Sequence, residues 1–277
     1  MSRYEKEVTE SKRFEFGENW GNFLQVLDNE RILQAEQSLK NMLEIENLEG
    51  KRFLDIGSGS GLFSLAARRL GARVYSFDYD PNSVACTKEL KRRYFSDDHN
   101  WIVEEGDVLN KKYLSELGEF DIVYSWGVLH HTGDMWKALE NICTNVADEG
   151  KLYIAIYNDQ GRKSKYWKTI KELYNKSPNF IKLWIVSLCL FRLWAPTIIR
   201  DLASGKPMYS WRNYSKKRGM SPWYDVVDWV GGYPFEVAKP EEIFEFYKKS
   251  GFGLAKLVTC GGGLGCNEYV FIKKDLN

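Results

Sequence analysis

Between Arg52 and Tyr157 the sequence alternates short apolar runs with amphipathic stretches, and this alternation constrains the fold more than any other feature. The amphipathic stretches have the spacing of helices: one spans Leu62–Leu70, and another begins at Pro81 with Asp80 as its cap. Repeated strand–helix units predict an α/β fold with a doubly wound, mostly parallel sheet. Within this region the apolar runs predict strands at Arg52–Ile56, Arg73–Phe77, Trp101–Glu104, Phe120–Ser125 and Lys151–Tyr157.

The alternation stops after Tyr157 and resumes near the C-terminus. Residues 158–238 are rich in Trp, Tyr, Lys and Arg without a strand pattern, and we interpret them as an insertion. A helix beginning at Pro240 and two strands, Leu254–Thr259 and Tyr269–Lys273, would then complete a seven-stranded sheet. The predicted division is an N-terminal helical lid or cap (1–50), an α/β core (51–157), the insertion (158–238) and the completion of the sheet (239–277).

Composition narrows the class of protein. Of the 277 residues 44% are apolar, which supports a sizeable core, and the formal net charge is +1, so no global field attracts nucleic acid or an anionic membrane. The N-terminal residues are charged and lack the apolar stretch of a secretory signal. Five scattered cysteines without a CxxC pair predict reduced thiols, no zinc site and a cytoplasmic location.

The segment from Phe180 to Leu202 is the most apolar of the chain. Its longest uncharged run reaches only from Leu183 to Phe191, whereas a membrane span needs about 20 residues. We therefore expect no transmembrane segment, a helix that breaks at Pro196, and a position that is either buried or in contact with a partner.

The sequence FLDIGSGSG follows the first predicted strand and indicates a ligand-binding turn. Gly57, Gly59 and Gly61 give G-x-G-x-G rather than the dinucleotide pattern G-x-G-x-x-G, and no Lys-Ser or Lys-Thr of a phosphate loop follows. Asp55 would repel a pyrophosphate about 5 Å away by roughly 3 kcal/mol at an effective dielectric of 20. The same carboxylate suits an ammonium or sulfonium group. A tight structural turn and a dehydrogenase without its third glycine are the alternatives.

This stretch resembles the first motif of class I S-adenosylmethionine (SAM) dependent methyltransferases, and three later stretches resemble further motifs in the same order. The resemblance implies that Asp78 binds both ribose hydroxyls and that Tyr79 lies against the adenine. It also implies that Asp107 accepts the adenine amino group and that the backbone N–H of Val108 meets the ring. Ser125 and Trp126, in FDIVYSWGVLHH, would contact the methionine moiety.

The residues nearest the expected methyl group carry the catalytic hypotheses. His130 and His131 follow the fourth strand, where one of them could take a proton or orient the acceptor, or both could be structural. Tyr157 and Asn158, at the end of the fifth strand, face the same expected cleft. A general base helps a hydroxyl acceptor most, and the sequence leaves open whether oxygen, nitrogen or carbon is methylated.

Aromatic and basic residues suggest where an acceptor binds, with plain packing or a solvated face as the alternatives. The N-terminal aromatics could fold over the cofactor as a lid or hold the next helix to the sheet. These are Phe14, Phe16, Trp20 and Phe23. The insertion could bind a sugar, quinone or lipid-like acceptor through Trp167, Trp184, Trp194, Trp211, Trp223, Tyr224 and Trp229, or an anionic group through Arg200, Arg212, Lys216, Lys217 and Arg218.

The resemblance favours a methyltransferase for a small-molecule acceptor, and two alternatives stay open. An RNA methyltransferase fits the basic and aromatic stretch after Gly161, but the net charge of +1 is poor for binding phosphates, so nucleic acid is not expected. A non-catalytic SAM-binding subunit could dock a partner through Leu183–Trp194. Homodimer formation is left open.

Overall fold

The structure is a computed structural model of the chain, and it describes residues 2–218 and 222–274. These residues form a seven-stranded sheet in the order β3-β2-β1-β4-β5-β7-β6. The strands are β1 (Arg52–Ile56), β2 (Arg73–Asp78), β3 (Trp101–Glu105), β4 (Phe120–Trp126), β5 (Val146–Tyr157), β6 (Phe252–Val258) and β7 (Cys266–Lys273).

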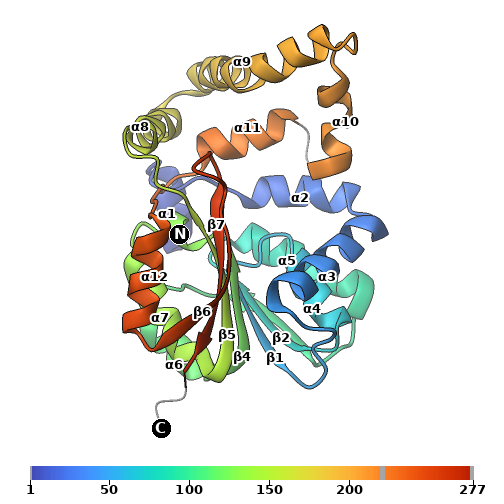
Figure 1. Cartoon of the computed structure of the whole chain (residues 1–277), viewed down its shortest axis with the longest axis vertical. Helices are drawn as coiled ribbons and strands as arrows, with labels where there is room; N and C mark the ends of the chain where they lie inside the picture. The colour runs from blue at the N-terminus through green and yellow to red at the C-terminus, as the bar shows by residue number, and fades with distance from the viewer. Residues whose placement is uncertain (1, 219–221, 275–277) are drawn as a thin grey trace.

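Helices precede, connect and follow these strands (Figure 1). Before the sheet come α1 (Arg3–Thr9), α2 (Gly17–Val26) and α3 (Asn29–Leu43). Between the strands lie α4 (Leu62–Arg69), α5 (Pro81–Phe95), α6 (Lys111–Leu117), α7 (Met135–Ile142) and the short 3₁₀ helices η1 (Leu129–His131) and η2 (Cys143–Asn145). The insertion forms α8 (Arg162–Lys176), α9 (Asn179–Ala203), α10 (Tyr209–Arg218) and α11 (Pro222–Gly231), and α12 (Pro240–Lys249) precedes β6.

The predicted fold class is confirmed. Strands β1 to β5 pair in parallel, and β7 pairs antiparallel with both β5 and β6. The strand boundaries lie close to the expected ones, except that β5 begins at Val146 and β7 at Cys266. The side chain of Asp80 accepts a hydrogen bond from the N–H of Asn82, as expected for the cap of α5.

Each face of the sheet is covered by helices because successive strand residues point to opposite sides. Phe53 belongs to a core with residues of α3, α4 and α5, whereas its neighbour Leu54 belongs to a core with residues of α7 and α12. This three-layer arrangement leaves the carboxyl ends of the parallel strands open to the N-terminal segment and the insertion (Figure 1).

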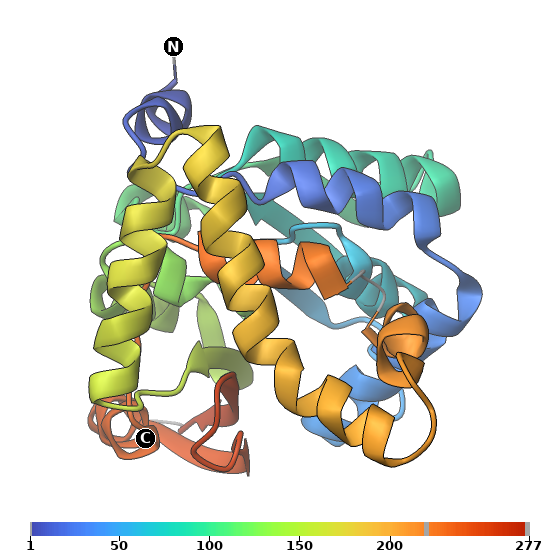
Figure 2. The ribbon, with the colours of Figure 1, turned by 90° about the horizontal axis from the view of Figure 1, so that it is seen from above.

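The insertion packs as a helical layer with a core of its own, which includes Trp167, Val186, Trp194 and Val230. Its two ends meet: Asn158 and Ala238 form an isolated parallel bridge. Helix α9 lies farthest from the sheet (Figure 1), and seen from above it crosses in front of α11 (Figure 2).

The break expected in the apolar segment is wrong. Helix α9 does not break at Pro196: it is one helix of 25 residues, from Asn179 to Ala203. A proline removes one backbone hydrogen bond, and the packing of α9 against α8, α10 and α11 holds the helix together across that gap. Of the two positions expected for the segment, the structure does not support the buried one, because only Val186, Cys189, Trp194 and Asp201 are buried in it. Among the described residues, α9 is the one helix long and apolar enough to cross a membrane by length and composition.

Candidate active site

A cavity of about 1110 Å³ lies at the carboxyl ends of the strands. Its wall is formed by the loops after β1, β2, β3 and β4, by the segment from α1 to α2, and by residues of α9, α10 and α11. Pockets for one small ligand usually measure about 300–1,000 Å³, so this cavity has room for a cofactor and an acceptor side by side.

The glycines of the first loop have two different roles. Gly57 (φ +78°) and Gly59 (φ +54°) line the cavity, and a Cβ atom at Gly57 would come within 2.4 Å of Val128. A Cβ atom at Gly59 would approach the indole of Trp20 to 3.1 Å. Gly61 is absent from the cavity wall, and its Cβ would meet Thr87 of α5 at 3.0 Å. Gly61 therefore lets α4 pack closely on α5, and the structure does not support direct ligand contact there.

Asp55 lies at the floor of the cavity near the end of β1, almost completely buried. Its carboxylate accepts a hydrogen bond from the hydroxyl of Ser64, which is itself 2.7 Å from that of Ser76. Burial, helped by the nearby carboxylate of Asp78, raises the pKa of Asp55 to about 7. A cation in the cavity would favour the ionised form of Asp55 and would be bound more strongly by it.

Asp78, at the end of β2, is held by the backbone. The N–H of Gly59 donates to its Oδ2 atom and the N–H of Asp80 to its Oδ1 atom, both at 2.9 Å. Burial raises the pKa of Asp78 to about 6 even though these two bonds lower it. The fixed carboxylate faces the cavity beside the glycine loop, where it can accept hydroxyl groups of a ligand.

The loops after β2 and β3 carry the residues expected at the adenine. Tyr79, Asp107 and Val108 all line the cavity. Asp107 accepts the N–H of Leu109 at 2.8 Å on Oδ1, and Arg3 donates to its Oδ2 atom at 3.3 Å. The second contact was not expected from the sequence, because Arg3 belongs to the distant N-terminal helix.

The two residues expected at the methionine moiety have different positions relative to the cavity. Trp126 lines the cavity with a side chain that is 44% exposed. Ser125 is fully buried, and its hydroxyl donates to the carbonyl of Ile56 at 3.0 Å. The side chain of Ser125 therefore ties β4 to β1 and does not reach the cavity. Side chains alternate along a strand, so the side chains of these two neighbours point to opposite faces of the sheet.

The paired histidines also have different environments. His131 lines the cavity, whereas His130 is fully buried behind it and does not. The Nδ1 atom of His130 accepts the N–H of Tyr157 at 3.3 Å, and its Nε2 atom has no partner. Burial lowers the pKa of His130 well below its ordinary value. The structure thus gives no support to a catalytic His130, because this ring is neutral and away from the cavity.

His131 has a defined tautomer. Its Nδ1 atom lies 2.6 Å from the carbonyl oxygen of Pro234. Because a carbonyl only accepts, Nδ1 carries the hydrogen and Nε2 keeps a lone pair. Burial, helped by Lys171 and Arg13, lowers the pKa of His131 to about 3, so the ring is neutral at physiological pH. Tyr157 lines the cavity beside it, and burial raises the pKa of Tyr157 above its ordinary range, so this phenol stays protonated.

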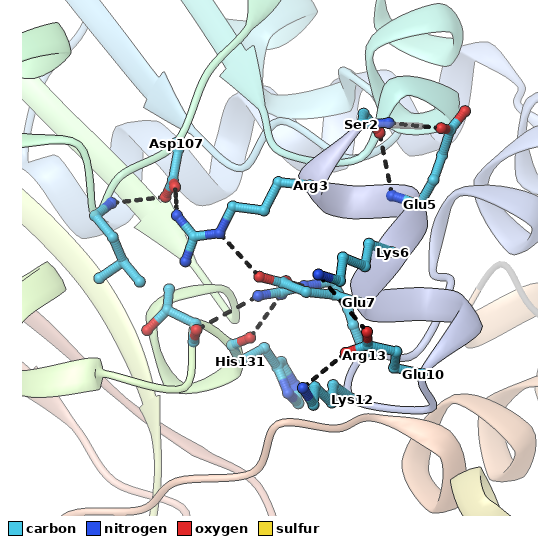
Figure 3. A network of polar contacts seen from close by, with 12 residues as sticks. Ser2, Arg3, Glu5, Lys6, Glu7, Glu10, Lys12, Arg13, Asp107 and His131 are labelled. Carbon is cyan, nitrogen blue, oxygen red and sulfur yellow. Dashed lines mark hydrogen bonds and ion pairs between the residues drawn. The ribbon is translucent and has the colours of Figure 1, made fainter.

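The N-terminal segment covers the cavity. Glu7 accepts hydrogen bonds from both Arg3 and Arg13, and Arg13 donates in turn to the carbonyl of His131 at 2.9 Å (Figure 3). Arg3 and Arg13 therefore tie α1 both to Asp107 and to the loop after β4. Farther along, the N–H of Gly17 donates to Asp80 at 2.7 Å. All four N-terminal aromatics singled out in the sequence line the cavity, as a lid would: Phe14, Phe16, Trp20 and Phe23.

The insertion closes the far end of the cavity. Trp194 and Trp229 line it, whereas Trp167, Trp211 and Trp223 belong to the insertion's own core. The two remaining insertion aromatics, Trp184 and Tyr224, are 69% and 44% exposed. Of the basic candidates, Arg200 lines the cavity and Arg212 is exposed. The side chains of Lys216, Lys217 and Arg218 lie outside the described residues.

Sequence reasoning missed three residues near this end. Asp225 and Asp228 of α11 line the cavity, and their spacing of three residues on one helix was the available signal. Asp225 accepts the hydroxyl of Tyr214 at 2.5 Å. Lys171 is fully buried, its ammonium donates to the carbonyl of Trp229, and burial lowers its pKa to about 7. Nothing in its basic stretch distinguished Lys171 from its exposed neighbours.

Comparison with known proteins agrees with this geometry. The methyltransferase domain family matches residues 27–185, more than half of the chain. The chain therefore belongs to this family, within the class I SAM-dependent methyltransferases, and SAM is its cofactor. The residues of this end of the cavity fit SAM. The carboxylates of Asp55 and Asp78 would attract a cationic nucleoside and repel a diphosphate, and the glycines between them leave room for the ligand.

Curated relatives match only part of the chain. The ubiquinone biosynthesis O-methyltransferase of Rhizobium johnstonii is 33% identical over 113 residues, which cover 40% of this chain and 43% of that protein. The ribosomal protein L11 methyltransferase of Prochlorococcus marinus (strain MIT 9515) is 42% identical over 84 residues, covering 29% and 27%. The chain thus spans less than half the length of these relatives.

A solved structure shares the fold over most of the chain. The magnesium protoporphyrin IX methyltransferase from Synechocystis PCC 6803, with bound SAH, superposes with a TM-score of 0.52 over 88% of this chain and 83% of the other, at 13% identity.

Proposed function

We propose that this protein transfers the methyl group of SAM to a small-molecule acceptor by in-line displacement. The observation that carries the proposal is one continuous cavity with chemically different ends. Carboxylates and glycines lie at the strand ends, and a neutral histidine with aromatic rings lies toward the insertion. Such a cavity holds two reactants in contact and excludes water, which is the main requirement of a transfer between them.

At the strand ends, this chain's residues would hold the cofactor. Asp55 would attract the positively charged part of the molecule, Asp78 would accept the ribose hydroxyls, and Tyr79, Asp107 and Val108 would surround the adenine. SAM, when bound, supplies a methyl group on a sulfonium that is already a good leaving group. The protein's task is therefore to orient the acceptor and to remove its proton.

His131 is our candidate for receiving that proton. The carbonyl of Pro234 fixes the hydrogen on Nδ1, so the lone pair of Nε2 is the basic position of a ring that lines the cavity. Phe16 packs against the same ring at a centroid distance of 5.0 Å and limits its rotation. Tyr157 lines the cavity as a protonated phenol and would donate a hydrogen bond to the acceptor.

The acceptor end favours a molecule with a ring or another apolar part. Trp194, Trp229 and Tyr157 line it together with polar groups of α10 and α11. We propose a sugar, quinone or lipid-like precursor that is methylated on a hydroxyl, since a neutral histidine assists oxygen most. The match to ubiquinone biosynthesis O-methyltransferases of Rhizobium johnstonii and Rhodopseudomonas palustris supports this choice.

Two measurements test the proposal. Calorimetry should show binding of SAM and of its demethylated product, and Asp78→Ala should weaken it at least about tenfold through loss of two charge-assisted bonds. Transfer of labelled methyl from SAM to fractions of a metabolite and lipid extract should then identify the acceptor. Uptake of a nicotinamide nucleotide in place of SAM would overturn the assignment, and so would SAM binding with no transfer to any fraction.

A further inference from the structure

The outer surface of α9 carries exposed apolar side chains along most of its length. Most are spaced three or four residues apart, so they share one side of the helix, opposite the buried Val186 and Cys189. Their exposed fractions range from 57% to 74%. We call this set the outer face of α9: Phe180, Leu183, Trp184, Leu188, Phe191, Ile199 and Leu202. Monomeric proteins rarely expose so many large apolar side chains together, so the face has an occupant.

Charge around this face is strongly asymmetric. Residues 162–218 contain fourteen Lys and Arg but two Asp and Glu, a formal excess of twelve positive charges in a chain whose total is +1. Among the described residues of α8 and α9, ion pairs join only Lys176 to Glu172 and Arg200 to Asp201. In this part of the described chain, Lys165 and Arg192 are exposed cations that form no ion pair. An apolar row with a basic surround is the composition of helices that lie in the interface of an anionic membrane.

We infer that the outer face of α9 docks on the surface of an anionic lipid bilayer, with the helix parallel to the membrane plane. The inference concerns this surface and does not depend on the proposed reaction. A second copy of the chain is a poor occupant because its own basic helices would be brought against these. A nucleic acid would pair with the cations but leave the apolar row in water.

A parallel orientation follows from the inner side of α9. Trp194 and Asp201 are buried there, and Asp201 accepts hydrogen bonds from the N–H and the hydroxyl of Ser210. Crossing a bilayer would break these contacts and place Asp201 in hydrocarbon. Leu193, Trp194 and Thr197 also form a wall of the cavity, so docking brings the acceptor end of the cavity to the lipid surface.

Vesicle flotation tests the inference with the full chain. Vesicles of phosphatidylcholine and phosphatidylglycerol (about 3:1) should bind the protein at least about tenfold more tightly than pure phosphatidylcholine vesicles. The double variant Trp184→Ser/Leu188→Ser should lose at least about tenfold of that binding. The matched control is Leu33→Ser/Ile102→Ser, which changes apolar side chains that are 49% and 48% exposed elsewhere, and it should bind like the wild type. SAM calorimetry on each variant shows that the fold is intact and reports on the cofactor site separately.

Three results would overturn the inference. The first is a lack of binding to the anionic vesicles, and the second is an equal loss of binding in the Leu33→Ser/Ile102→Ser control. The third is a dimer, detected by light scattering, that becomes a monomer in the Trp184→Ser/Leu188→Ser variant. A depth measurement then distinguishes docking from spanning. Lipids brominated near the headgroup should quench the fluorescence of Trp184. This quenching should therefore be seen in the wild type and be absent in the Trp184→Phe variant. Stronger quenching by lipids brominated at the chain end would show a spanning helix instead.

Discussion

The proton linkage of the two buried carboxylates gives the sharpest prediction about cofactor binding. Burial raises the pKa of Asp55 to about 7 and that of Asp78 to about 6. Both must be ionised to bind SAM, one opposite its positive charge and one to accept ribose hydroxyls. Because the pKa values are raised, lowering the pH protonates these groups and removes the binding-competent form.

The magnitude follows from these two values. Roughly 1% of the protein has both carboxylates ionised at pH 5.5 and roughly 70% at pH 7.5, so the apparent Kd for SAM should fall by about 100-fold over this range. Titration calorimetry at half-unit steps measures it, and repeating each step in buffers of different ionisation enthalpy should show protons released on binding at the lower pH values.

Three variants isolate the source of the effect. Asp55→Asn keeps an oxygen that can accept the Ser64 hydroxyl but cannot titrate, so its SAM affinity should be weaker at pH 7.5 and less dependent on pH. Asp78→Asn should also show a shallower slope. Asp121→Asn is the control, because Asp121 lies at the end of β4 away from the cavity. Burial would raise the pKa of Asp121, but the ammonium of Lys51 and the N–H of Arg52 stabilise its carboxylate and the pKa is lowered. An affinity that is constant from pH 5.5 to 7.5, or a full slope in the Asp55→Asn/Asp78→Asn double variant, would refute the reasoning.

Three further predictions concern single residues. His131→Gln should lower kcat by about 100-fold with SAM affinity unchanged, because a proton acceptor is lost while the cofactor groups remain. Gly59→Val should abolish SAM binding in calorimetry, since its side chain would strain a positive φ and push Trp20 into the cavity. For Lys171→Met, the difference in Tm between the variant and the wild type should be about 5 °C more favourable to the variant at pH 6.5 than at pH 9. Burial lowers the pKa of Lys171 to about 7, so wild-type stability rises with pH from about 7 toward the ordinary value of 10.5.

Each of these has a contrary outcome. Equal kcat in His131→Gln would leave His131 a structural residue held by Pro234. Normal SAM affinity in Gly59→Val would separate the loop from the cofactor. A pH-independent difference in Tm between wild type and Lys171→Met would mean that the buried ammonium does not titrate in this window.

The sequence by itself determined the sheet and the cofactor end of the cavity. Strand positions followed from apolar runs, and the mostly parallel, doubly wound sheet followed from the alternation of strands and helices. Asp55 was predicted at the ligand from its place beside the glycine turn, and Asp78 and Asp107 from the resemblance of their motifs to those of SAM-dependent methyltransferases. In such a sheet, place in the chain nearly fixes place in space, so local motifs are enough.

Tertiary structure decided which member of each local pair faces the cavity. His130 and His131 are neighbours of the same type, and packing against Tyr157 buries the first while Pro234 orients the second. Ser125 and Gly61 were expected at the ligand but are used in packing between elements. These outcomes depend on contacts between residues far apart in the chain, which no local pattern contains.

The same holds for the segments outside the sheet. No sequence signal connected Arg3 with Asp107, 104 residues away, or showed that Lys171 is buried among aromatic rings. Helix α9 was expected to break at Pro196 and to be either buried or in contact with a partner, yet it continues through Pro196 and exposes Trp184 and Phe191. Apolar periodicity shows that a helix has an apolar side, but only the packing of the other helices decides whether that side is covered.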